Sequence, residues 1–135
     1  MIAAAFAALL LALLAAHHVG DHWLQTHRQA QAKGARDRAG ALACLAHVAS
    51  YTACTVVFGA LAWWLLDLPI SPVGFAAGQV LSALTHYWTD RRFTLAWLAR
   101  LVDKGEYYAN GGAYALDQSF HWLWLTVAAG VTVVA

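Results

Sequence analysis

Histidine and aspartate recur four residues apart in three separate parts of this 135-residue chain. The pairs are His17/Asp21, His86/Asp90 and, in reverse order, Asp117/His121. Residues at positions i and i+4 lie on one face of an α-helix, so each pair offers two side chains one turn apart. Neutral imidazole and carboxylate are good ligands for Zn, Mn, Fe or Ni. The pairs therefore predict a divalent metal site that is shared by several helices.

The first pair follows a stretch without any polar side chain, residues 1–16. A membrane span needs about 20 apolar residues, so a span that starts near the N-terminus must include His17 and Asp21. Polar residues at that depth are costly, and in membrane proteins they usually mark function. No Lys or Arg precedes Arg28, so the stretch lacks the positive region of a secretory signal. We therefore expect a retained span.

The composition favours a polytopic membrane protein of one domain, residues 1–135. The chain is 61% hydrophobic and 11% charged, against about 25% charged for a soluble domain. Its mean hydropathy is +0.55. We expect Cys44 and Cys54, which share an apolar stretch, to be small buried residues and not a disulfide. We expect membrane lipids as partners and no nucleic acid.

Hydropathy and turn residues divide the chain into four expected spans, at about 2–26, 40–66, 73–90 and 113–135. Basic and apolar residues alternate over about 91–104, which predicts an amphipathic helix lying in the membrane interface. The alternative is that the third span continues into water. The expected fold is an all-α membrane four-helix bundle with up-down topology.

All eight basic residues fall in two connectors, the one after the first span and the one after the third. They are Arg28, Lys33, Arg36, Arg38, Arg91, Arg92, Arg100 and Lys104. Basic residues concentrate on the cytoplasmic side of membrane proteins. This distribution predicts a multi-pass protein with both termini outside.

In such a bundle, the polar residues of all four spans fall in the cytoplasmic half. The first and third spans carry their pairs near their C-terminal ends, and the second and fourth carry His47 and the Asp117/His121 pair near their N-terminal ends. The predicted metal ligands are His17, Asp21, His86, Asp90 and His121. His47 or Asp117 is predicted to act as general base. The alternative is a structural polar layer, because a lone histidine in a span more often hydrogen-bonds a neighbouring helix.

Other polar residues of the first span are weaker candidates. His18 and His22 face about 100° away from His17 and Asp21, so we expect them at the lipid or solvent interface. Gln25 and Gln118 are expected to hydrogen-bond the ligands.

The motif series resembles a domain-of-unknown-function family of small bacterial and phage-borne integral membrane proteins. The matching residues are His17-x-x-Gly20-Asp21-x-x-x-Gln25, His47, His86-x-x-x-Asp90 and Asp117-Gln118-x-x-His121. The family usually has a large apolar residue after the first Asp, where this chain has His22. The resemblance implies a four-span fold, the bacterial inner membrane and a shared site, but no reaction. A looser likeness is to inner-membrane metal-dependent hydrolases.

Three functions fit these residues. The first is a metal-dependent hydrolase acting on an amphiphilic substrate. The second is an ion or proton carrier, which needs polar residues in the outer halves of the spans, and these are almost wholly Ala, Leu, Val and Trp. The third is a non-catalytic membrane module with a structural metal, whose basic connectors dock anionic lipid or a cytoplasmic protein. The metal's identity and the oligomeric state stay open.

Overall fold

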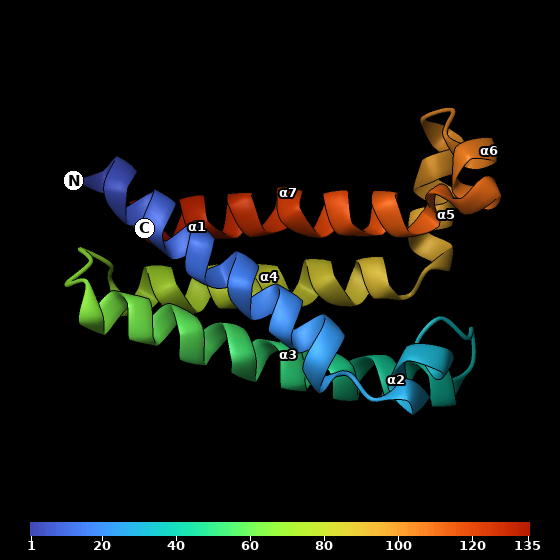
Figure 1. The fold of residues 1–135 in the computed structure, drawn as a ribbon, viewed down its shortest axis with the longest axis horizontal. Helices are drawn as coiled ribbons and strands as arrows, with labels where there is room; N and C mark the ends of the chain where they lie inside the picture. The colour runs from blue at the N-terminus through green and yellow to red at the C-terminus, as the bar shows by residue number, and fades with distance from the viewer.

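The long apolar stretches form long helices in the computed structural model, which describes residues 1–135 and contains helices and no strand (Figure 1). The long helices are α1 (Ile2–Val19), α3 (Arg38–Leu65), α4 (Pro72–Asp90) and α7 (Ala113–Val134). The all-α prediction is confirmed. Asp117 lies inside α7, which begins at Ala113, so this aspartate is not a helix cap.

Side chains cap the N-terminal ends of α3 and α4. Asp37 accepts a hydrogen bond from the Gly40 amide at the start of α3, and Ser71 accepts one from the Gly74 amide at the start of α4. Such caps satisfy amide groups that have no partner within the helix. They fix where α3 and α4 begin.

Shorter elements gather at one end of the bundle (Figure 1). They are η1 (Gly20–Leu24, a π-helical turn), α2 (His27–Ala32), α5 (Phe93–Leu101), α6 (Gly105–Tyr107) and η2 (Tyr108–Gly112). Both termini and the turn between α3 and α4 lie at the opposite end. The two connectors that contain every Lys and Arg therefore share one end of the molecule.

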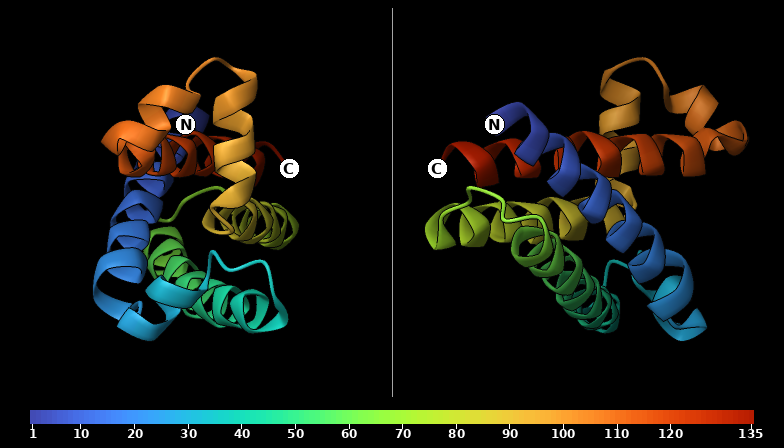
Figure 2. Two further views of the ribbon diagram at one scale, coloured as in Figure 1. Left: turned by 90° about the vertical axis from the view of Figure 1, so that its right-hand side faces the viewer. Right: turned by 60° about the vertical axis from the view of Figure 1, so that its left-hand side comes forward.

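The helices approach closely where a glycine faces a neighbour. α1 lies obliquely across the bundle: the N-terminal end of α1 lies near α7, and the C-terminal end of α1 lies near α3 (Figures 1 and 2). A Cβ atom on Gly20 would lie 3.3 Å from the Tyr51 ring of α3. A Cβ atom on Gly78 of α4 would clash with the Thr132 hydroxyl of α7. Such close packing without a side chain is common between membrane helices.

The interior has an apolar half and a polar half. Buried Leu9, Leu13, Leu125 and Ala129 form the apolar core with Ile70, towards the end that carries the termini. The histidines and aspartates of the motifs lie nearer the end with the connectors.

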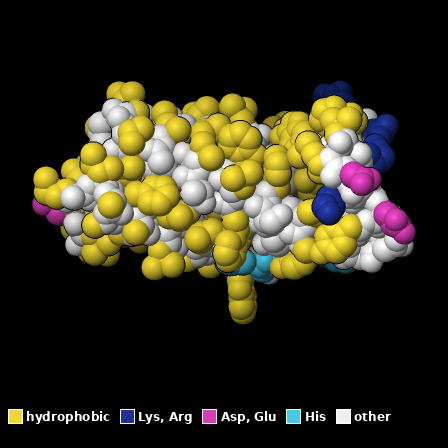
Figure 3. Space-filling model, turned by 90° about the horizontal axis from the view of Figure 1, so that it is seen from above, with side chains coloured by type: hydrophobic (Ala, Val, Ile, Leu, Met, Phe, Trp, Pro, Cys, Tyr) yellow, Lys and Arg dark blue, Asp and Glu magenta, His cyan; other side chains and the backbone are white.

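Two segments are long and apolar enough to cross a membrane, Ile2–Leu24 and Arg38–Leu65. Seen from above, apolar side chains cover most of the surface, and most charged side chains gather at one end (Figure 3). These observations support a membrane location by length and composition alone.

We predict that Gly78→Ala lowers the free energy of unfolding by about 1 to 3 kcal/mol, because the new methyl group overpacks the α4–α7 contact. Its Cβ atom would also lie 2.9 Å from the Ala128 carbonyl oxygen. Gly130→Ala is the matched control, since nothing lies within 4 Å of a Cβ atom there. Unfolding in a denaturing detergent titration measures both, and equal stability of the two variants would contradict the packing argument.

Candidate metal centre

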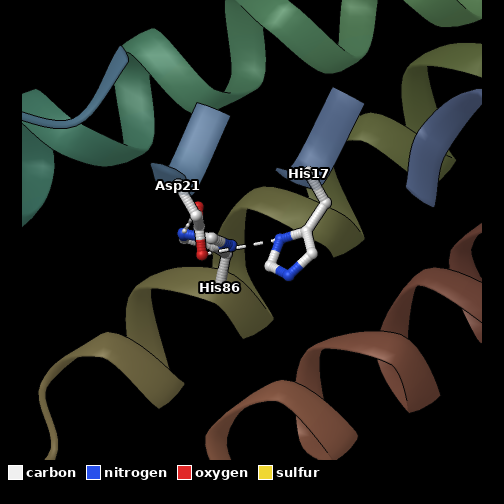
Figure 4. Close-up of side chains that lie close together, drawn as sticks. All are labelled: His17, Asp21 and His86. Atoms are coloured by element: carbon white, nitrogen blue, oxygen red, sulfur yellow. Dashed lines mark ion pairs between the residues drawn. The ribbon is translucent and has the colours of Figure 1, made fainter. Parts of the chain in front are cut away.

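The seven predicted site residues converge in one region of the bundle, although they come from five different elements. His17 lies in the last turn of α1, Asp21 lies in η1, His47 in α3, His86 and Asp90 in α4, and Asp117 and His121 in α7. The most deeply buried of them are His17, His47, His86 and Asp90, each no more than 1% exposed. Figure 4 shows His17, Asp21 and His86 pointing toward one another.

Four of these side chains lie close together, and we call them the quartet: Asp21, His47, His86 and Asp90. The Nε2 atoms of the two histidines are 3.0 Å apart. Asp90 Oδ2 lies 3.2 Å from each Nε2 atom, and Asp21 Oδ1 lies 3.4 Å from each. Ligands at about 2.0 to 2.1 Å from a tetrahedral Zn²⁺ ion are about 3.3 to 3.4 Å apart. The distances from each carboxylate oxygen to the two histidine nitrogens are therefore close to those between the ligands of one metal ion. Ligand atoms of His47, His86 and Asp90 lie within 4.8 Å of one another, and so do those of His17, Asp21 and His86.

The two carboxylate oxygens of the quartet are buried and make no hydrogen bond. Burying an unpaired carboxylate oxygen is costly, so such atoms in a native structure need an explanation. Both oxygens face the same two imidazole nitrogens. A divalent cation at the centre would satisfy all four atoms together.

Two further histidines flank the quartet, each with one ring nitrogen free. His17 Nε2 is 3.2 Å from the Gln118 side-chain oxygen, which can only accept a hydrogen bond, so Nδ1 carries the lone pair. His121 donates from Nδ1 to the Asp117 carbonyl oxygen at 2.8 Å, which leaves Nε2 with the lone pair. Both free nitrogens are buried without a hydrogen-bond partner. They lie 3.6 Å from Asp21 and 3.9 Å from Asp90, respectively.

The structure adds a charged residue that sequence reasoning missed. Lys33 lies just after α2, and its Nζ atom is 2.8 Å from Asp90 Oδ1. The residue is 8% exposed, whereas we had grouped it with the basic residues of a cytoplasmic connector. No local pattern separates Lys33 from its basic neighbours, because its partner is 57 residues away in the sequence.

The neighbouring arginines hold the connector that carries Lys33 against the end of α4. Arg91 is buried and donates to the Ala35 carbonyl oxygen. Arg92 donates to the Ala30 carbonyl oxygen at 2.9 Å. These bonds keep the connector, and Lys33 with it, close to the quartet.

A pocket of about 420 Å³ adjoins the quartet. Its lining residues are Asp21, His22, Gln25, Lys33, Arg92, Tyr108, Ala113, Tyr114, Asp117 and Gln118. Asp21 and Asp117 are the two predicted site residues that reach it, and the Asp117 side chain is 26% exposed. Burial, and after it the charge of Asp117, raise the pKa of Tyr108 above its ordinary value, so this hydroxyl stays protonated.

His18 and His22 lie outside the centre, on an exposed face of the first helical segment. Their rings stack on each other and contact Trp122 and Tyr114 of α7, respectively. Gln118 bonds to His17, as expected, whereas the Gln25 side-chain nitrogen is buried without a partner.

Comparison with known proteins adds a family and no function. A family model described as a protein of unknown function (DUF3307) matches residues 9–135. No curated protein and no solved structure matches the chain.

We predict that Lys33→Met lowers the free energy of unfolding by about 3 to 5 kcal/mol, because it leaves the buried Asp90 carboxylate without its cationic partner. Lys104→Met is the matched control, since Lys104 is the other lysine of the chain and is exposed. Asp90→Asn combined with Lys33→Met should recover part of the loss in a double-mutant cycle. Equal unfolding midpoints for the two single lysine variants would contradict this role.

Proposed function

The chain belongs to DUF3307, a family of unknown function, and from its site we propose a membrane-embedded, metal-dependent hydrolase that acts on an amphiphile. The observation that carries the proposal is the quartet, in which two carboxylate oxygens without a hydrogen bond both face the same two imidazole nitrogens. Burying a carboxylate oxygen without a hydrogen bond destabilises the fold, and a bound cation would remove that free-energy cost.

We propose that the four long helices all cross the bacterial inner membrane. α4 and α7 contain 19 and 22 residues, close to the length that a span needs. Their polar site residues face the bundle interior, where such residues lie in membrane proteins. The basic connectors would then face the cytoplasm, and both termini would lie outside. α5, which carries Arg100 among exposed Trp97 and Leu101, would lie in the interface.

We propose Asp21, His47, His86 and Asp90 as the metal ligands. This gives His47 a ligand's role in place of the general base first considered, because its Nε2 atom belongs to the quartet. His17 and His121 then flank the ion as proton acceptors, since each holds a free nitrogen beside a quartet carboxylate. Asp117 reaches both the pocket and His121, so it would orient that histidine.

A divalent cation bound there would supply Lewis acidity and make a bound water a better nucleophile. The residues of the chain would do the rest. His17 Nδ1 or His121 Nε2 can take a proton, because the other ring nitrogen of each already donates a hydrogen bond. The pocket supplies the approach for a substrate from the connector side.

A proton or ion carrier is the second candidate, and one observation favours it. Tyr51 bonds to Ser82 at 2.8 Å, and Thr55 bonds to Gln79 at 2.8 Å, so polar contacts between α3 and α4 continue beyond His86. We had expected apolar outer halves, but hydropathy averaged over a span hides single inward polar residues. A carrier needs no resident metal, which separates it from the hydrolase.

The orientation leads to a labelling prediction, in a background with Cys44 and Cys54 replaced by alanine. Leu66→Cys, in the exposed turn between α3 and α4, should react with a membrane-impermeant maleimide in intact cells. Gln31→Cys, exposed in α2, should react only after lysis. The reverse pattern would overturn the proposed orientation.

The metal leads to a second prediction, for protein purified in detergent without chelators. Wild type should hold one divalent ion per chain, and His86→Ala should lose it together with the stability that the ion contributes, about 2.7 kcal/mol at 100 times the dissociation constant. Metal content by elemental analysis and thermal unfolding measure the two losses. Acidification should also release the ion, because the ligands must be deprotonated to bind.

His18→Ala is the control, since His18 is an exposed histidine of α1 that lies outside the centre. Wild-type protein that contains no metal would contradict the proposed metal-dependent hydrolase. If His86→Ala then cost only about 0.6 kcal/mol, as a typical hydrogen bond between membrane helices does, the residues would form a structural layer. Proton flux into liposomes that Gln79→Leu abolishes would instead establish the carrier.

A further inference from the structure

The pocket beside the quartet presents more hydrogen-bond donors than the protein uses. The Gln25 side-chain nitrogen is buried without a partner. The Arg92 guanidinium makes one hydrogen bond, to the Ala30 carbonyl oxygen, and forms no ion pair. Lys33 also lines the pocket while it contacts Asp90. Three side chains from different segments therefore offer donors to one space.

The charge of this space depends on the metal. Two carboxylates, Asp21 and Asp117, balance two cationic side chains, Lys33 and Arg92, so the lining alone is neutral. The two positive charges of a divalent ion at the quartet would outweigh the one negative charge that Asp90 adds, so the region would then be positive. Arginine recognises tetrahedral oxyanions through paired N–H donors, and lysine contributes a point charge.

We propose that this pocket binds the phosphoryl group of an anionic amphiphile next to the metal. The proposal rests on the proposed function, because the ion supplies the excess positive charge. Arg92 and Gln25 would hold the phosphoryl oxygens, and Lys33, which contacts Asp90 of the quartet, would add a positive charge beside them. A volume of about 420 Å³ is in the range of pockets that enclose small ligands.

The surroundings of the pocket suit an amphiphile. Tyr114 lines the pocket and is 63% exposed, and Trp122 lies two turns further along the same helix and is 47% exposed. Trp23 and Leu24, which directly precede Gln25 in the sequence, are also exposed. Aromatic side chains at such positions favour the boundary between lipid tails and polar headgroups. A ligand can therefore leave its tails among these residues while its headgroup enters the pocket.

The test compares phosphatidic acid, diacylglycerol with the same tails, and inorganic phosphate, each added to the full-length, metal-loaded protein in neutral detergent. Native mass spectrometry counts the bound molecules, and titration gives apparent dissociation constants. We expect phosphatidic acid to bind and diacylglycerol not to bind. Arg92→Gln should weaken phosphatidic acid at least tenfold, and Gln25→Leu, which breaks no hydrogen bond of the protein, should weaken it severalfold.

Arg100→Gln is the matched control, because Arg100 is an exposed arginine of the same connector and does not line the pocket. Arg92→Lys should restore part of the affinity. Inorganic phosphate that binds as tightly as phosphatidic acid would make a free phosphate the ligand and overturn the lipid assignment. Equal binding by wild type, Arg92→Gln and Gln25→Leu would overturn the site.

Metal content, measured on the same samples, separates this inference from the proposed function. A protein that holds metal but binds neither phosphate nor phosphatidic acid contradicts the pocket assignment and leaves the metal centre intact. A protein that binds phosphatidic acid through Arg92 without any metal supports the pocket and contradicts the metal-dependent hydrolase.

Discussion

A carboxylate buried among apolar helices must be paired, and Asp90 is the residue on which this constraint falls most heavily. One of its oxygens contacts Lys33 and the other faces His47 and His86. The lysine can reach Asp90 only because α2 and the residues after it fold back onto the end of α4. Arg91 and Arg92 hold them there through the carbonyl oxygens of Ala35 and Ala30. The fold of the connector is thus tied to the pairing of one buried charge.

The same constraint explains how the interior is divided. Close contacts at Gly20 and Gly78 bring helix backbones together, so polar side chains can meet across short distances. Towards the termini, the interior is filled by Leu9, Leu13 and Leu125, which need no partners. Towards the connectors, the buried histidines, Asp90 and Lys33 depend on other residues for their hydrogen bonds or charge balance. Apolar packing stabilises the half near the termini, and contacts between polar side chains stabilise the half near the connectors.

Sequence pattern was enough for the helices and for most of the centre, because both depend on local spacing. The i, i+4 pairs identified His86 and Asp90, and the position of His47 in its span placed it in the same half of the bundle. Lys33 was missed because only the tertiary fold brings it to Asp90. The contact between Thr55 and Gln79 was missed because the direction of a single polar side chain within an apolar span depends on how the helices are rotated. The roles proposed for His47 and His17 likewise rest on the directions of their ring nitrogens, which sequence spacing does not contain.

The order of the four quartet residues along the chain has a consequence for biosynthesis. Asp21, His47, His86 and Asp90 all lie within the first 90 residues, and so does Lys33. α7, which adds His121 and Gln118 beside His17, follows all of them in the sequence. A nascent chain therefore contains every atom of the quartet before the helix that packs along α4 has been made. Until α7 has been made, the face of α4 that packs against it is uncovered, so His86 and Asp90 depend on α3 and on Lys33 for their polar contacts.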